Sequence, residues 1–189
     1  MTDYEPELWL IRHGETEWSL NRRHTGRTDL PLIPAGEAEA RALAPRLAGI
    51  HFDLVLSSPL SRARRTAELA GLSPRLEPLA REWDYGQYEG ITSGQIQESE
   101  PGWSVWSSPV VGGESIEQVA ARADAVIKRV RAQAPERAVL VAHAHFLRIL
   151  SVRWIEQPPR LGEHLNLRTS ALSVLGWDRG LPVIDRWNG

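Results

Sequence analysis

Leu8-Trp9-Leu10-Ile11-Arg12-His13-Gly14-Glu15-Thr16 carries the strongest structural signal in this chain. Its apolar first half predicts a short buried strand over Leu8–Arg12. Open α/β sheets bind ligands outside the carboxyl ends of their strands, which is where Arg12 and His13 fall. An arginine fork suits phosphate oxygens, and a neutral imidazole can attack phosphorus. The stretch therefore predicts a phosphate site at the end of a sheet strand.

Apolar runs and capping signals divide the rest of the chain into alternating strands and helices. Further strands are expected at Phe52–Ser57, Leu76–Leu79, Ala138–Ala142, Ser170–Gly176 and Pro182–Trp187. Helices are expected at Pro34–Gly49, Ser58–Ala70, Thr92–Glu98, Ser115–Gln133 and His145–Glu156, with a polar loop over Leu20–Ile33. This alternation predicts an α/β protein, a three-layer α/β/α sandwich around a mostly parallel sheet.

The composition is that of an ordinary globular chain of 189 residues, with 42% hydrophobic and 24% charged residues. This length predicts one domain. A net charge of −2 gives no support to nucleic-acid or membrane-surface binding, and without cysteine there are no disulfides. The acidic start, Met1–Glu7, is unlike a secretory signal, so we expect a cytoplasmic protein.

Four elements of the sequence resemble those of the histidine phosphatase superfamily, which is phosphoglycerate mutase-like in fold. Arg12–Thr16 matches its Arg-His-Gly signature, which continues with an acidic residue and Ser or Thr. Ser58–Ala63 resembles its Ser-Pro-x-x-Arg-Ala element, and Glu82–Gly90 its Glu-x-x-x-Gly-x-x-Glu-Gly stretch. His143 ends the strand Ala138–Ala142, as the family's second histidine does. The resemblance covers nearly the whole chain.

The resemblance implies a reaction and a role for each matching residue. His13 is the expected nucleophile, which takes the phosphoryl group from a small phosphate ester. Arg12, Arg62 and His143 are expected to bind that group. Glu82 is the expected general acid, with Asp84 as its local rival, and Glu89 is read as a turn residue. No metal and no cofactor are expected, because the cationic side chains provide the charge stabilisation.

Four further positions are expected to contact substrate, two of them with departures from the family pattern. Thr25 and Gly26 match a Ser/Thr-Gly pair. Ser19 stands where the family usually has Asn, and it can still donate one hydrogen bond. Ala144 stands where Gly is usual, a mild change if its φ is negative.

Other readings of these residues stay open at this stage. His143 and His145 form a His-x-His pair that can ligate a metal, but no acidic cluster of the usual form accompanies it. The tryptophan-rich segment 83–113 is expected either to act as a lid or to pack a small subdomain. Arg22, Arg23 and Arg27 are read as a solvated loop rather than a second anion site.

The activity that the resemblance implies is hydrolysis of small phosphate esters, with sugar phosphates among the candidates. Glu82 and His143 are 61 residues apart, which is short for the mutase branch of the family. Phosphoglycerate mutase remains an alternative, as does a binding protein without turnover. A homodimer is also left open.

Overall fold

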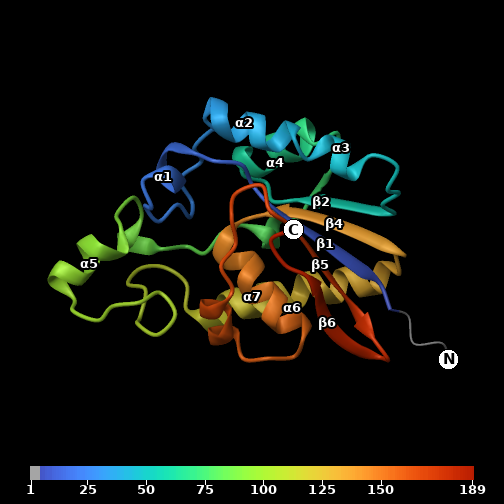
Figure 1. Ribbon diagram of the computed structural model, residues 1–189. Helices are drawn as coiled ribbons and strands as arrows, with labels where there is room; N and C mark the ends of the chain where they lie inside the picture. Colours follow the sequence, from blue (N-terminus) through green and yellow to red (C-terminus); the bar gives the residue numbers. More distant parts are fainter. Residues whose placement is uncertain (1–4) are drawn as a thin grey trace.

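A six-stranded sheet forms the centre of the computed structural model, which describes residues 5–189 (Figure 1). The strands are β1 (Glu7–Arg12), β2 (Leu54–Ser57), β3 (Arg75–Leu76), β4 (Arg137–Ala142), β5 (Leu172–Asp178) and β6 (Leu181–Arg186). Their order across the sheet is β3-β2-β4-β1-β5-β6. The first four are parallel, whereas β5 and β6 are antiparallel additions next to β1. The predicted mostly parallel sheet is confirmed.

Helices cover both faces of this sheet. One layer contains α2 (Pro34–Arg41), α3 (Ala44–Leu47) and α4 (Ser61–Leu69), and the other contains α6 (Ile116–Gln133) and α7 (Ala144–Trp154) (Figure 1). Two short helices, α1 (Glu17–Leu20) and α5 (Ser93–Ser99), lie beyond one end of the sheet (Figure 1). Three 3₁₀ turns, at Pro78–Ala80, Gly86–Tyr88 and Pro159–His164, complete the regular structure. The predicted three layers are confirmed.

Strand β4 shows why the sheet is buried on both sides. Successive side chains of a strand point to opposite faces. Val139 and Val141 accordingly pack in the cluster that contains Ala63 of α4, whereas Leu140 packs in the cluster that contains Phe146 of α7. A continuous apolar run is what a central parallel strand requires.

The helix predicted over Pro34–Gly49 is wrong as a single element. The structure breaks it into α2 and α3 after Arg41. Pro45 has no N–H to donate to the Arg41 carbonyl, and its ring would clash there, so the chain cannot continue one helix.

Two further boundaries differ from the sequence prediction. Helix α4 begins at Ser61 rather than Ser58, because the Ser58 N–H bonds the Val141 carbonyl and extends the sheet. Asp29 accepts hydrogen bonds from the Ser61 N–H and hydroxyl, both at 2.8 Å, at the start of the helix. The strand predicted at Leu76–Leu79 is wrong beyond Leu76, because Pro78 starts a 3₁₀ turn.

The predicted start of a helix at Ser115 is confirmed, where Ser115 forms a capping box with Gln118. Thr92 forms a second capping box, with Gln95, which the sequence analysis did not predict. Within residues 5–189, the structure contains no helix that has both the length and the apolar character to cross a membrane.

Candidate active site

A cavity of about 670 Å³ opens at the carboxyl ends of β1 and β4. Its walls come from the segment after β1, the start of α7 and the tryptophan-rich segment. Among the residues that line it are Arg12, His13, Ser19, Thr25, Glu82, Tyr85, Trp103, Trp106, Ala144, His145 and Arg148. Six of the nine residues predicted for the site therefore lie on one cavity wall, while Arg62, His143 and Gly26 lie behind it.

His13 is held as a neutral base. Its Nδ1 lies 2.7 Å from the Gly14 carbonyl oxygen, which can only accept, so Nδ1 carries the proton and Nε2 the lone pair. Burial, with the nearby charges of Arg62 and Arg12, keeps the pKa of the His13 imidazole well below its ordinary value. His13 is thus buried, lines the cavity and has Nε2 available as a nucleophile.

His143 lies beside His13, with the two ring centroids 5.2 Å apart. The Arg62 Nε donates to His143 Nδ1 at 3.2 Å, which fixes the imidazole proton on Nε2. That Nε2–H donates to the Ser58 hydroxyl at 2.8 Å. Both histidines are therefore neutral and locked in opposite tautomers, and burial lowers the pKa of His143 as well.

Arg62 is fully buried inside a cage of carbonyl groups. Its Nη1 donates to the Thr28 carbonyl at 2.9 Å, and its Nη2 donates to the carbonyls of Thr25 and Gly26 at 3.0 and 3.1 Å. Glu89 shapes this cage by accepting the Gly26 and Thr28 N–H groups at 2.9 and 3.0 Å. The structure thus gives Glu89 a role that the sequence did not indicate.

Arg12 is one of four arginines that line the cavity, with Arg22, Arg23 and Arg148. Its Nη1 donates to the Leu167 carbonyl at 2.6 Å, which fixes the side chain across the site. Its Nε is buried and has no hydrogen-bond partner within residues 5–189. A buried donor without a partner is costly, so an oxygen ligand at this point would be stabilised.

Glu82 is buried at the start of α7. Its carboxylate accepts the N–H of the next residue, Trp83, at 3.0 Å. It also accepts the N–H groups of Phe146 at 2.9 Å and of His145 at 3.0 Å. The last two are free donors of the first turn of α7, and the side chain of His143 does not cap them. Glu82 therefore caps α7 from a distant loop and at the same time lines the cavity.

An ion pair fixes the loop that carries Glu82. Arg122 of α6 forms two hydrogen bonds of 2.7 Å with the Glu114 carboxylate. The same guanidinium donates to the carbonyls of Leu79 and Arg81 at 2.6 and 2.9 Å. Glu114 in turn accepts the Asp84 N–H at 3.0 Å. Both sides of the Glu82 loop are thereby tied to one half-buried pair.

The four predicted substrate contacts divide into two groups. Ala144 lines the cavity as the first residue of α7 and is not among the positive-φ residues, so its departure from glycine is mild. Ser19 and Thr25 also line the cavity, but the Ser19 hydroxyl donates to the Thr16 carbonyl at 3.0 Å. Gly26 is buried behind the wall, where a Cβ would lie 2.4 Å from the Trp83 carbonyl oxygen. Whether each contacts substrate stays a prediction.

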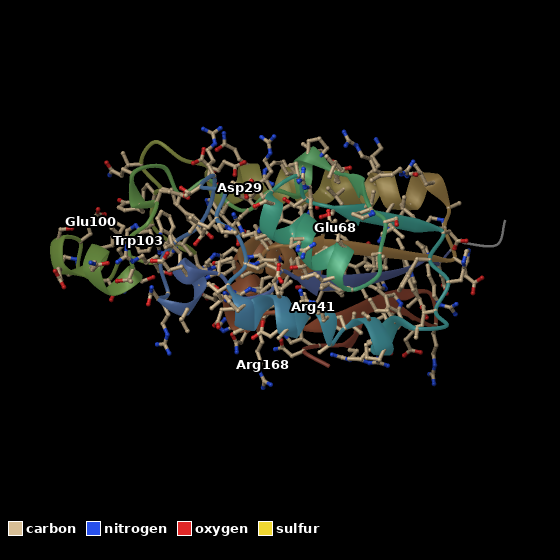
Figure 2. All side chains as sticks on the ribbon, turned by 90° about the horizontal axis from the view of Figure 1, so that it is seen from above. Asp29, Arg41, Glu68, Glu100, Trp103 and Arg168 are labelled. Atoms are coloured by element: carbon tan, nitrogen blue, oxygen red, sulfur yellow. The ribbon has the colours of Figure 1, made fainter. Side chains whose placement is uncertain are left out.

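Aromatic residues form the outer wall, and three of them, Tyr85, Trp103 and Trp106, belong to the segment 83–113 that the sequence analysis considered as a lid. The His145 ring packs against Tyr85 and Trp106. The His24 ring packs against Tyr85 and Trp103. Figure 2 shows Trp103, with Glu100, on the segment that extends beyond the sheet. Along the chain His24 and these three residues lie between 39 and 121 residues from His145, so the fold alone brings them to its ring.

A neutral buried histidine flanked by arginines, at the carboxyl ends of parallel strands, is suited to phosphoryl transfer. The chain belongs to the histidine phosphatase superfamily (branch 1), whose family model matches residues 8–189. The family and the fold class predicted from the sequence are both confirmed.

Individual relatives carry related activities. An acid phosphatase of Mycobacterium tuberculosis is 40% identical, over 92% of this chain and 88% of the relative. A sedoheptulose 1,7-bisphosphatase of Saccharomyces cerevisiae is 30% identical, over 82% and 69%. A probable phosphoglycerate mutase of Cronobacter sakazakii is 30% identical, over 96% and 89%. The solved structure of an open reading frame of Mycobacterium tuberculosis superposes with a TM-score of 0.92 and 36% identity, over 97% of both chains.

Proposed function

We propose that this chain is a phosphatase that hydrolyses small phosphate esters through a phosphohistidine intermediate, without a metal ion. The observation that carries the proposal is the state of His13. Its Nδ1–H is committed to the Gly14 carbonyl and its pKa is well below the ordinary value, so Nε2 keeps its lone pair at neutral pH.

The proposed reaction has two steps. His13 Nε2 attacks phosphorus, the bond to the ester oxygen breaks, and Glu82 gives its proton to the leaving alkoxide. Glu82 then takes a proton from water, whose oxygen attacks the phosphohistidine and releases inorganic phosphate and neutral His13. Positioned acids of this kind typically accelerate a reaction by about 10²–10⁴-fold.

The cationic groups would replace a metal ion in this scheme. Arg12 lies on the cavity wall and would bind the phosphate directly through its guanidinium. Arg62 and His143 lie behind His13, from where Arg62 adds positive potential and holds His143 in one tautomer. Direct contacts of these two with the phosphate, as expected by resemblance, remain a prediction.

Phosphorus NMR in the presence of a chelator tests the proposal. The protein is incubated separately with 3-phosphoglycerate, a sugar bisphosphate and p-nitrophenyl phosphate, with a His13→Ala variant alongside. We expect inorganic phosphate only when His13 is intact. Protein quenched in alkali during turnover should also carry a base-stable, acid-labile phosphoryl group, and turnover without that group would contradict the covalent step.

The mutase alternative is kept because one relative is a probable phosphoglycerate mutase. Conversion of 3-phosphoglycerate to 2-phosphoglycerate without phosphate release, and with dependence on a bisphosphate primer, would establish it. Ligand binding without turnover, unaffected by replacing Glu82, would indicate a binding protein.

Some expectations from the sequence remain predictions: the single domain, the lid, the cytoplasmic location, the absence of nucleic-acid binding and the homodimer.

A further inference from the structure

His145 lies in the first turn of α7, next to the proposed acid. Its backbone N–H binds the Glu82 carboxylate at 3.0 Å, while its ring lines the cavity. Trp106 packs against this ring with centroids 5.1 Å apart, and Trp83 does so at 6.2 Å, both nearly edge to face. The ring therefore has one orientation, set by large aromatic neighbours.

Tyr85 fixes the tautomer of this ring. Its hydroxyl lies 2.5 Å from His145 Nδ1, and it has no second hydrogen-bond partner within the part of the chain that the structure describes. If Nδ1 carried the proton, the buried tyrosine O–H would be left without an acceptor, which is unfavourable. The hydroxyl therefore donates to Nδ1, and the neutral ring carries its proton on Nε2.

The charge states of both groups are consistent with this arrangement. Burial raises the pKa of the Tyr85 phenol well above its ordinary value, so the phenol keeps its proton. Burial also lowers the pKa of His145 well below its ordinary value, with further lowering by Arg148 and His24. His145 thus has one N–H donor, and this Nε2–H has no partner within residues 5–189.

The position of His145 assigns this donor to the leaving group rather than to the phosphate. In the proposed reaction the phosphate binds beside Arg12 and His13, and the ester oxygen must reach Glu82. The part of the substrate beyond that oxygen then occupies the cavity next to Glu82, where the His145 ring and Trp106 form the wall.

We propose that His145 Nε2–H is a specificity-determining donor that binds an oxygen of the leaving group, with Tyr85 as the residue that positions it. The site would thereby favour phosphate esters whose leaving group carries a hydroxyl or carboxylate near the ester oxygen. Esters with a purely hydrocarbon leaving group cannot satisfy this donor. The inference rests on the proposed function, because it deepens the description of the same site.

The test compares kcat/KM for two oxygen-bearing esters, ribose 5-phosphate and 3-phosphoglycerate, with that for n-butyl phosphate, an alkyl ester that depends on Glu82 in the same way but has a hydrocarbon leaving group. His145→Phe keeps a ring but removes the donor. We expect kcat/KM to fall about tenfold more for at least one oxygen-bearing ester than for n-butyl phosphate, the effect of one neutral hydrogen bond. His145→Gln, which offers an acceptor to Tyr85 and a donor to the cavity, should restore most of that ratio. Tyr85→Phe should shift the ratio in the same direction.

A matched control is His51→Phe, since the His51 side chain is 85% exposed and does not line the cavity. This variant should leave kcat/KM unchanged for all three esters. Equal losses of kcat/KM for all three esters in His145→Phe would leave their ratio unchanged. This result would mean that the ring only supports Glu82, and it would overturn the inference. If the wild-type protein hydrolyses none of the three, the proposed function fails and this inference with it. Hydrolysis with an unchanged ratio removes only the inference.

Discussion

Removing the Arg122 guanidinium should misplace Glu82 without touching the cavity. The Arg122→Met variant keeps an apolar side chain of similar length and takes away the cation between Glu114 and the 79–82 loop. Glu114 then keeps one of its hydrogen bonds, from the Asp84 N–H, and the carbonyls of Leu79 and Arg81 lose their donor.

The size of the effect follows from the burial of the pair. Loss of one partner of a fully buried ion pair costs about 3–5 kcal/mol. Here the two side chains are 17% and 23% exposed, so water screens part of the charge left behind, and we expect a loss of about 2–3 kcal/mol. For a chain of this length that lowers Tm by roughly 5–10 °C.

The displacement of Glu82 should also lower the turnover number. Displacing a catalytic group by about 1 Å can cost about 10²-fold in rate, so kcat should fall by about one to two orders of magnitude. The loss should be greatest for alkyl esters, which need protonation of the leaving oxygen. Thermal unfolding and steady-state kinetics with an alkyl and an aryl phosphate measure both parts.

Arg153→Met is the matched control, because Arg153 forms a comparable two-point pair with Asp124 on the outside of the same helices. It should lose less than about 1 kcal/mol, with kcat unchanged. If Arg122→Met unfolds at a lower temperature but keeps its kcat, the reasoning that the pair positions Glu82 is refuted. An unchanged Tm would refute the energetic part.

Three other predictions concern the buried titratable groups. Glu82→Gln should lower the unfolding free energy by about 1–3 kcal/mol, because one acceptor at the start of α7 is replaced by a donor. It should also slow hydrolysis of alkyl esters more than that of p-nitrophenyl phosphate. Urea unfolding and steady-state kinetics measure the two effects, and an unchanged stability would contradict the capping role. On acidification from pH 7 to about 5.5, kcat/KM should show no loss at the ordinary histidine pKa, because the lowered pKa of His13 keeps its imidazole neutral; a sharp fall near 6.5 would contradict it. The unfolding free energy should nevertheless decrease over the same pH range, because the unfolded histidines take up protons that the folded His13, His143 and His145 do not. The pKa of His24 is lowered to about 4, so this residue acts in the same direction. Each histidine contributes up to about 1.4 kcal/mol per pH unit, and urea midpoints that stay constant between pH 7 and 5.5 would contradict the prediction.

Local sequence signals account for the parts of the fold that were predicted. β1 and β4 are apolar runs, and the helix after Ser115 has its cap and its apolar stripe within a few residues. The order Arg12, His13, Arg62, His143 placed all four at the sheet because each follows a strand or starts the helix after one. Such signals depend only on neighbours along the chain.

The parts that escaped prediction depend on contacts between distant segments. The cap of α7 comes from Glu82, more than sixty residues before it, and the cap of α4 comes from Asp29. A Cβ on Gly14 would lie 2.3 Å from the Gly36 carbonyl oxygen. The lack of a side chain at Gly14 therefore allows α2 to pack against the site loop.

The two outer strands of the sheet have a consequence for how copies of this chain can associate. On one side β3 has only two residues, both exposed, which is too short a template for another strand. On the other side β6 contains Pro182, which has no N–H, and ends in the charged pair Asp185-Arg186. Both borders thus resist intermolecular β-pairing, which protects the folded chain from fibrillar aggregation. A homodimer of this protein would have to form through helices or loops rather than through a continuous intermolecular sheet.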